Sequence, residues 1–236
     1  MRAYAASEPE VALRVVRAVL ARHAADGLVC QRYLRRNQAP EGVDILANNA
    51  SALVGLLRDI VGIQPKWNRL YLEPHAPAEL AGTRLDYWLR GVDYGVELGV
   101  EDCALSAGGI TLRAAAPFGV SAAAASAAGG RSLEFFAGSS AAPALTIRIE
   151  ARGSPTIEAR IDRWDSDNGA RAWTLTARGA AATARLAVHG LTAGARYSIV
   201  GNGEVVSRFE GGRAGEAALD AALEDGVPRR FEIRAP

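Results

Sequence analysis

The spacing of apolar residues changes near Trp67, and this change constrains the fold more than any other feature of the sequence. Before Trp67, apolar residues recur every three or four positions, as in amphipathic helices. After it, short segments alternate apolar with polar residues between Gly, Pro, Asn or Asp turns; examples are RLYLEPH, TRLDYWLRG, AWTLTAR and RRFEIRA. The sequence therefore predicts an α+β protein, with helices first and mostly antiparallel β-sandwich domains after them.

The first expected helix has signals at both of its ends. Ser7 is a candidate cap ahead of Pro9, and Gly27 suits a left-handed C-terminal cap. Between these ends, the apolar stripe consists of Ala12, Val15, Val16, Val19, Leu20 and His23. This pattern predicts a helix with one face turned towards a core.

A second helix is expected over about residues 49–61, with Asn48 or Asn49 as its cap and Gly62 as its stop. Its apolar face consists of Leu53, Leu56, Leu57, Ile60 and Val61. Two helices with such broad faces cannot bury both of them against each other. We therefore expect the helical hairpin to pack on something else, which could be the following domain, a second copy of the chain, or helices that the chain lacks.

Three domains are expected from these patterns. Residues 1–66 form the helical hairpin, residues 67–140 an antiparallel β-domain, and residues 141–236 an immunoglobulin-like β-sandwich. The boundary between the two β-domains is placed at the turn Gly138-Ser139-Ser140 or at the alanine-rich stretch 121–130.

Composition excludes several kinds of partner. The formal net charge is only +1, which gives no field that would attract nucleic acid or an anionic membrane. The start of the chain lacks a signal peptide and no segment reaches the length of a membrane span, so a cytoplasmic location is expected for the chain as given. The two cysteines, Cys30 and Cys103, match no metal or redox spacing, and no nucleotide-binding or paired-histidine motif occurs. No metal and no cofactor are expected.

The stretch between the two expected helices collects the groups that a sugar site needs. It is about twenty residues long, whereas such connections usually have roughly two to eight. Arg32, Tyr33, Glu41, Asp44 and Asn49 bring a guanidinium, an aromatic ring, carboxylates and an amide to this stretch or its edge. These groups can hydrogen-bond hydroxyls, stack on a sugar ring and transfer protons. A solvated loop with helix caps at its ends would carry the same residues.

Residues 44–97 resemble the end of the catalytic barrel in six-hairpin glycosidases and in cellobiose-phosphorylase-like enzymes. The resemblance is carried by three phrases: GIQP at residues 62–65, WNRLYLEP at residues 67–74, and LRGVDYGV at residues 89–96. It implies that the helical hairpin is the last part of an (α/α)6 barrel, followed by trailing β-sandwich domains. Most of the barrel would then be supplied by a part that this chain does not contain.

The resemblance also implies roles for the residues of the long connection. In inverting members the general base lies before the final barrel helix, which makes Glu41 the first candidate; Asp44 is the second, or caps the helix. Inversion needs a separate general acid roughly 6.5 to 9.5 Å from the base, and that acid is expected outside this chain. Arg32, Tyr33 and Asn49 would contact the sugar at the rim.

An aromatic-rich region follows, made of Trp67, Tyr71, Tyr87 and Trp88. These rings could stack on sugars, with Trp67 as the substrate-binding candidate, or could be buried between the helical hairpin and the sandwich.

The expected function is that of the C-terminal portion of a carbohydrate-active enzyme, which cleaves glycosidic bonds by hydrolysis or phosphorolysis and is incomplete on its own. The expected ligand is an oligosaccharide or glycoside. One alternative is a non-catalytic carbohydrate-binding module. Another is a structural interaction protein that self-associates, or binds a partner chain, through its apolar helix faces.

Overall fold

The structure is a computed structural model, and it describes residues 2–27, 32–37, 39–42, 51–123, 130–149, 155–165, 170–212 and 215–234. These residues form two compact units. The helical unit consists of Met1–Gln64 and Leu72–Ala81, and the β unit consists of Pro65–Tyr71 and Gly82–Pro236. None of the described helices is both long and apolar enough to span a membrane.

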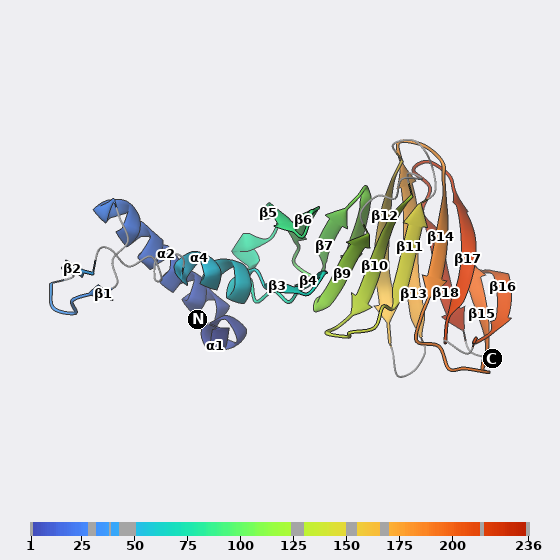
Figure 1. The fold of residues 1–236 in the computed structure, drawn as a ribbon, viewed down its shortest axis with the longest axis horizontal. Coiled ribbons are helices and arrows are strands. Elements are labelled where there is room, and N and C mark those ends of the chain that lie inside the picture. Colours follow the sequence, from blue (N-terminus) through green and yellow to red (C-terminus); the bar gives the residue numbers. More distant parts are fainter. Residues whose placement is uncertain are drawn as a thin grey trace. The chain divides into compact units, whose positions relative to one another are not determined.

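Helices and helical turns make up most of the described part of the helical unit (Figure 1). They are α1 (Arg2–Ser7), α2 (Pro9–Asp26), α4 (Ser51–Val54), the π-helical turn η1 (Gly55–Ile60) and the 3-10 turn η2 (Ala78–Leu80). Two short strands, β1 (Arg32–Tyr33) and β2 (Pro40–Glu41), pair with each other. The chain therefore has the helical start that the sequence predicted.

The ends of α2 confirm one prediction and correct another. Gly27 has φ +68° and ends the helix in the left-handed conformation, as expected. Ser7, however, is not the cap of α2. It is the last residue of α1, where its hydroxyl donates to the Ala3 carbonyl at 2.9 Å. The backbone explains this: the Glu8 amide donates to Tyr4 and the Ala12 amide donates to Glu8, so helical bonding runs almost without a break from α1 into α2.

The second expected helix appears as α4 followed by η1, and Gly62 follows its end with φ +82°. A Cβ on Gly62 would lie within 2.1 Å of the Glu73 carbonyl oxygen, so this position needs glycine for space as well as for conformation. The proposed caps Asn48 and Asn49 lie outside the described residues. The structure thus confirms the helix and its stop signal.

The core of the helical unit is small. Its buried members are Ala5, Ala12, Leu13, Val16 and Ile60, and the partly buried Leu20, Leu56, Ala76 and Leu80 pack against them. Leu13 is buried, whereas Val15, which belonged to the expected stripe, is exposed. The reason is that α1 and the segment around Ala76 and Leu80 contact α2 on the face that carries Leu13. These two elements cover part of the apolar surface. The large apolar side chains that stay exposed include Tyr4, Val15, Leu53, Val54 and Leu57.

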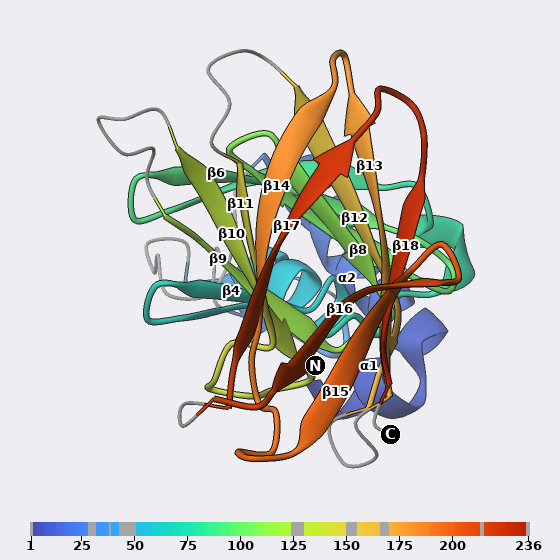
Figure 2. The ribbon, with the colours of Figure 1, turned by 90° about the vertical axis from the view of Figure 1, so that its right-hand side faces the viewer.

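The β unit consists mainly of two sheets that face each other as layers (Figures 1 and 2). In the described chain, the first sheet has seven strands: β3 (Ile63–Lys66), β4 (Arg69–Leu72), β9 (Phe118–Ala123), β10 (Arg131–Ala137), β11 (Leu145–Ile149), β14 (Ala182–Val188) and β17 (Ala217–Leu223). Their order across the sheet is β17-β14-β11-β10-β9-β4-β3. The strands β3 and β4 carry the chain between the two units.

The second sheet has nine strands among the described residues. They are β5 (Arg84–Leu89), β6 (Val92–Leu98), β7 (Cys103–Ala107), β8 (Ile110–Ala114), β12 (Thr156–Trp164), β13 (Arg171–Arg178), β15 (Arg196–Gly201), β16 (Glu204–Glu210) and β18 (Arg229–Arg234). Their order is β16-β15-β18-β13-β12-β8-β7-β6-β5. Most strand pairs are antiparallel, but β8 and β12 run parallel. Between these two strands the chain crosses to the first sheet, forms β9, β10 and β11 there, and returns.

The boundary expected near residue 140 does not separate two β-domains. Each sheet takes strands from both sides of this point, and the segment 138–144 only joins β10 to its neighbour β11. Strands after residue 141 therefore complete sheets that earlier strands begin, rather than forming an immunoglobulin-like sandwich of their own. The alternation of apolar residues predicted the strands, but it does not say which strand pairs with which.

Aromatic side chains fill the space between the two sheets. The ring of Phe135, in the first sheet, and the ring of Trp164, in the second sheet, pack edge to face with their centroids 5.4 Å apart. Trp164 in turn lies 6.0 Å from Trp173, whose ring stacks on Phe231 at 5.7 Å. Aromatic side chains bury more apolar surface per residue than other side chains do, and they therefore stabilise a core strongly. This column of four rings joins the two layers of the β unit.

A second aromatic cluster lies on the outer face of the first sheet. Tyr71 packs against Phe136 with ring centroids 6.2 Å apart, and its hydroxyl donates to the Ser140 carbonyl at 2.6 Å. Gly119 lies beneath the Tyr71 ring, where a Cβ would come within 2.6 Å of ring carbons. Glycine in this strand therefore marks a close approach, here of an aromatic ring.

We expect Gly119→Ala to destabilise the β unit by about 1–3 kcal/mol, because the added methyl group forces the Tyr71 ring off Phe136. Urea unfolding measures the loss. In a Tyr71→Ala background the same substitution should cost much less, since the ring is absent. Equal costs in both backgrounds would show that Tyr71 is not the reason for the glycine.

Candidate functional site

The structure describes the residues expected to form a sugar site between the helices to different extents. Arg32 and Glu41 face each other across β1 and β2, and their side chains form an ion pair. Tyr33 lies beside Arg32 in β1, but its side chain lies outside the described part of the structure, as do Asp44 and Asn49 entirely. The structure therefore brings together the Arg32 guanidinium and the Glu41 carboxylate, on an exposed pair of short strands.

Trp67, the remaining predicted binding residue, belongs to the β unit. It lies in the turn between β3 and β4, and 83% of its surface is exposed. An exposed indole of this size can act as a stacking surface.

The outer face of the nine-stranded sheet gathers the other candidate groups. Along β5, the exposed residues are Arg84, Asp86 and Trp88, while the residues between them point to the inner side. Cross-strand partners share a face, so the register places Glu97 beside Arg84, Gly95 beside Asp86 and Asp93 beside Trp88. The next strands add Ala104, Ser106, Thr111 and Arg113 to the same face. We call this set the β5–β8 face.

Trp88 is the large apolar side chain that the β5–β8 face exposes, with 68% of its surface accessible. Two carboxylates flank it: Asp86, two positions away on the same strand, and Asp93, directly opposite. Among the described residues, neither carboxylate has an ion-pair or hydrogen-bond partner. An open indole ring between two carboxylates with unused acceptor positions can hold a flat apolar ligand surface and its hydroxyl groups together.

A hollow of about 250 Å³ lies on this face, and Asp86, two positions along β5 from Trp88, belongs to its lining. Its floor is made of small residues, since Gly95 of β6 stands opposite Ser106 of β7 and Ala104 lies two positions from Ser106 on the same face. A Cβ on Gly95 would lie 2.4 Å from the Ser106 hydroxyl oxygen, so glycine here leaves that hydroxyl room. Arg84, Asp86 and Glu97 form part of the rim. The hollow therefore has a floor of small side chains and a polar rim.

Ion pairs fix the rim of the hollow. The Glu97 carboxylate contacts Arg84 and Arg113, at 3.2 Å in each case, and Arg113 also donates to Asp102 at 3.0 Å. Burial is the largest influence on Glu97 and would raise its pKa, but Arg113 and then Arg84 outweigh it and hold the pKa below its ordinary value. Burial would likewise lower the pKa of Arg113, yet Asp102 and Glu97 raise it. Glu97 and Arg113 therefore both stay charged at neutral pH.

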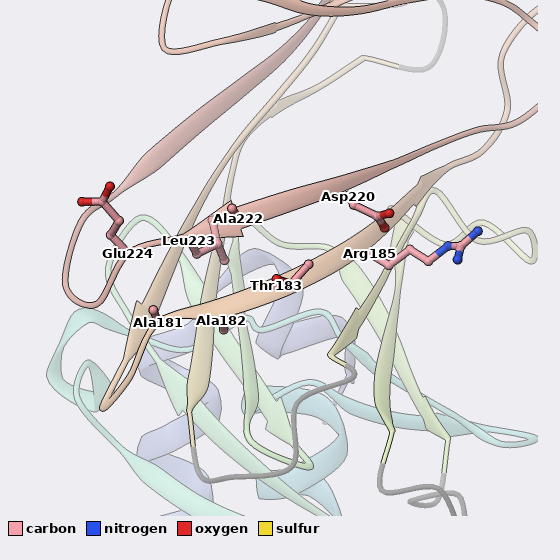
Figure 3. A pocket seen from close by; sticks show the side chains of 8 residues that line it. All are labelled: Ala181, Ala182, Thr183, Arg185, Asp220, Ala222, Leu223 and Glu224. Carbon is pink, nitrogen blue, oxygen red and sulfur yellow. The ribbon is translucent and has the colours of Figure 1, made fainter.

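Two further hollows lack the open ring. The first, of about 620 Å³, lies over β14 and β17 and is lined by small side chains with Arg185, Asp220 and Glu224 (Figure 3). The described residues of its lining include no aromatic ring. The second, of about 400 Å³, lies on β15 and β16, where Tyr197 and Phe209 stack on each other at 5.7 Å. Each of these two rings already covers a face of the other, so neither hollow offers a surface like that of Trp88.

The described residues contain no group of three or more His, Cys, Asp or Glu side chains placed to hold a metal ion. No protein-family model matches the chain, and no match is found among curated proteins or solved structures. The resemblance to six-hairpin glycosidases therefore stays a prediction from the sequence. The function has to be inferred from the geometry of the site.

Sequence reasoning named Trp88 only as one of several junction aromatics, and it missed Asp86 and Asp93. The signal was present in the segment RLDYWL, where strict alternation puts Arg84, Asp86 and Trp88 on one face. What the segment alone does not reveal is which face meets the core. That depends on the strands beside it.

The charge network predicts a dependence of stability on pH. The pKa of Glu97 is lower in the folded than in the unfolded chain, so its ion pairs stabilise the fold fully above the ordinary carboxyl pKa. This contribution is lost as the pH falls through the lower, folded-state value. We expect the free energy of unfolding to fall as the pH drops from neutral to about 3, and Glu97→Gln to make that fall shallower.

Urea unfolding at each pH measures this effect, with Glu204→Gln in the edge strand β16 as the control. The same pH profile in wild type and Glu97→Gln would show that the network does not contribute to acid sensitivity.

Proposed function

We propose that the chain is a carbohydrate-binding part of a carbohydrate-active enzyme, and that the β5–β8 face binds a neutral glycan. The single observation that carries this proposal is Trp88, an exposed indole between two carboxylates without partners among the described residues, on the same face as a hollow that Asp86 helps to line. Sugars combine an apolar ring face with a rim of hydroxyl groups, and this face offers a matching surface for each.

The charges around Trp88 favour neutral sugars over acidic ones. Arg84 and Arg113 are already paired with Glu97 and Asp102, whereas Asp86 and Asp93 are not paired among the described residues. Apart from Arg90 in the turn after β5, the charge that remains beside the ring is therefore negative. A uronic acid or a sulfated sugar would be repelled there, while neutral hydroxyl groups can donate hydrogen bonds to both carboxylates.

The shape of the face favours binding over catalysis. Ligand pockets of enzymes usually have about 300–1,000 Å³ and enclose most of their ligand. The hollow of the β5–β8 face has about 250 Å³ and a floor of Gly95, Ala104 and Ser106, so a sugar lying on it keeps one side in water. Such a surface can hold a glycan chain but does not exclude water from a reacting bond.

The enzyme context rests on the sequence resemblance and on the order of the two units. A helical start followed by a sandwich-like β unit agrees with the end of a six-hairpin glycosidase or phosphorylase. In that context the helical unit would pack against barrel helices from elsewhere, or against a partner chain. Its exposed apolar side chains support this: Tyr4, Val15, Leu53, Val54 and Leu57.

No described contact adds to the catalytic assignment of Glu41 and Asp44. Glu41 is held by Arg32 in an exposed ion pair, and Asp44 lies outside the described residues. Their role as general base, with Arg32, Tyr33 and Asn49 at the rim, therefore stays a prediction. It applies to the complete enzyme, where another part would supply the general acid.

The binding proposal is tested by affinity electrophoresis of the full chain in gels with β-glucan, xylan, glucomannan or pullulan, followed by calorimetry with the matching hexasaccharides. We expect at least one polymer to retard the wild-type chain. Trp88→Ala should weaken that binding about tenfold, because a stacked aromatic contributes on the order of 1.5 kcal/mol. Asp86→Asn should weaken it by a similar factor through the lost charged acceptor.

Arg185→Gln and Asp220→Asn are the matched controls, because they change the same kinds of group on the hollow over β14 and β17. They should bind like wild type. Retardation by no polymer, or retardation that Trp88→Ala leaves intact while Asp220→Asn removes it, would refute the assignment of the β5–β8 face.

A further inference from the structure

Trp67 combines two properties that stability alone does not explain. Its φ is +63°, in the region that disfavours side chains with a Cβ, and 83% of its surface is exposed. Among the described residues, the other non-glycine positions with positive φ are Arg90 and Asn202, and each of these precedes a glycine in a tight hairpin turn. Trp67 precedes Asn68 instead. A positive φ destabilises a residue such as tryptophan by roughly 1–2 kcal/mol, and an exposed ring does not offset this strain because it buries little apolar surface.

The neighbours of Trp67 hold the turn in place. The Lys66 ammonium lies 4.7 Å above the Tyr71 ring, and the Arg69 guanidinium lies 4.6 Å from the centre of the Phe136 ring. The Asn68 amide donates to the Ser121 hydroxyl at 3.4 Å. Three of the four turn residues thus contact the sheet through their side chains, whereas 83% of the surface of Trp67 is exposed. Fixing a ligand-binding side chain in advance reduces the entropy lost on binding.

The turn that carries Trp67 and the turn next to Trp88 lie on one side of the β unit. Figure 2 shows the β3–β4 and β5–β6 hairpins reaching out to the same side, near the labels β4 and β6. Trp88 is two residues from the turn of the second hairpin. The turn that contains Trp67 and the turn that follows Trp88 in β5 therefore lie on the same side of the β unit.

We infer that Trp67 is a second stacking subsite for the glycan that Trp88 binds, so that the ligand is an extended chain and not a single sugar. This inference rests on the proposed function of the β5–β8 face. A chain that reaches both rings gains a second contact in the same binding event, whereas a disaccharide can occupy only one ring. The strain at Trp67 is then retained because the ring serves binding.

The test compares Trp67→Gly, Trp67→Ala and Trp88→Ala, in the full chain, by calorimetry with the disaccharide and the hexasaccharide of the β-glucan, xylan, glucomannan and pullulan series. In wild type the hexasaccharide should bind more tightly. Both Trp67 variants should lose about three- to tenfold of hexasaccharide affinity and leave the disaccharide unchanged, whereas Trp88→Ala should weaken both ligands.

The melting temperature supplies a second readout. Trp67→Gly should melt at a higher temperature than wild type, because glycine tolerates the positive φ, but Trp67→Ala should not, because alanine keeps the strain. Unchanged hexasaccharide binding in Trp67→Gly, together with loss in Trp88→Ala, would overturn the second subsite and leave the proposed function standing. No binding of either ligand by wild type would overturn both.

Discussion

The packing of one face of each sheet against the other is the constraint on which the rest of the β unit depends. Side chains alternate between the two faces of a strand, so when the residues of one face are buried in the core, the residues of the other face are exposed. The ring column from Phe135 through Trp164 and Trp173 to Phe231 fixes which set is buried. A one-residue slip in β5 would bury Asp86 and Trp88 and expose Leu85 and Tyr87. The candidate site is thus a consequence of the core.

The same constraint makes the site rigid. Tyr94 is buried beneath the β5–β8 face, and its hydroxyl accepts a hydrogen bond from the Ala122 amide of the opposite sheet at 3.2 Å. Burial is the main cause that raises the pKa of this phenol, so it stays neutral. On the outer side, the Glu97 and Arg113 ion pairs hold the rim. A binding surface between a fixed core and a fixed rim loses little entropy when a ligand binds.

The parts of the fold that follow from local chemistry could be predicted from the sequence. Gly27 and Gly62 end helices because only glycine fits a left-handed position readily, and alternation identified the strands. Parts that depend on distant contacts could not be predicted. Ser7 lies in α1, Val15 is exposed, and strands on both sides of residue 140 share their sheets. The exposure of Trp88 belongs to this second group, because it depends on strand order.

Nuclear magnetic resonance mapping of the bound glycan on the full chain tests the central claim most directly. The measurement is the shift of backbone amide and indole signals during titration with the hexasaccharides of the four polymer series. The account predicts that the shifts concentrate on β5, β6, β7 and the Trp88 indole. It would be contradicted by shifts that concentrate on β14 and β17, or by no shift with any of the four ligands.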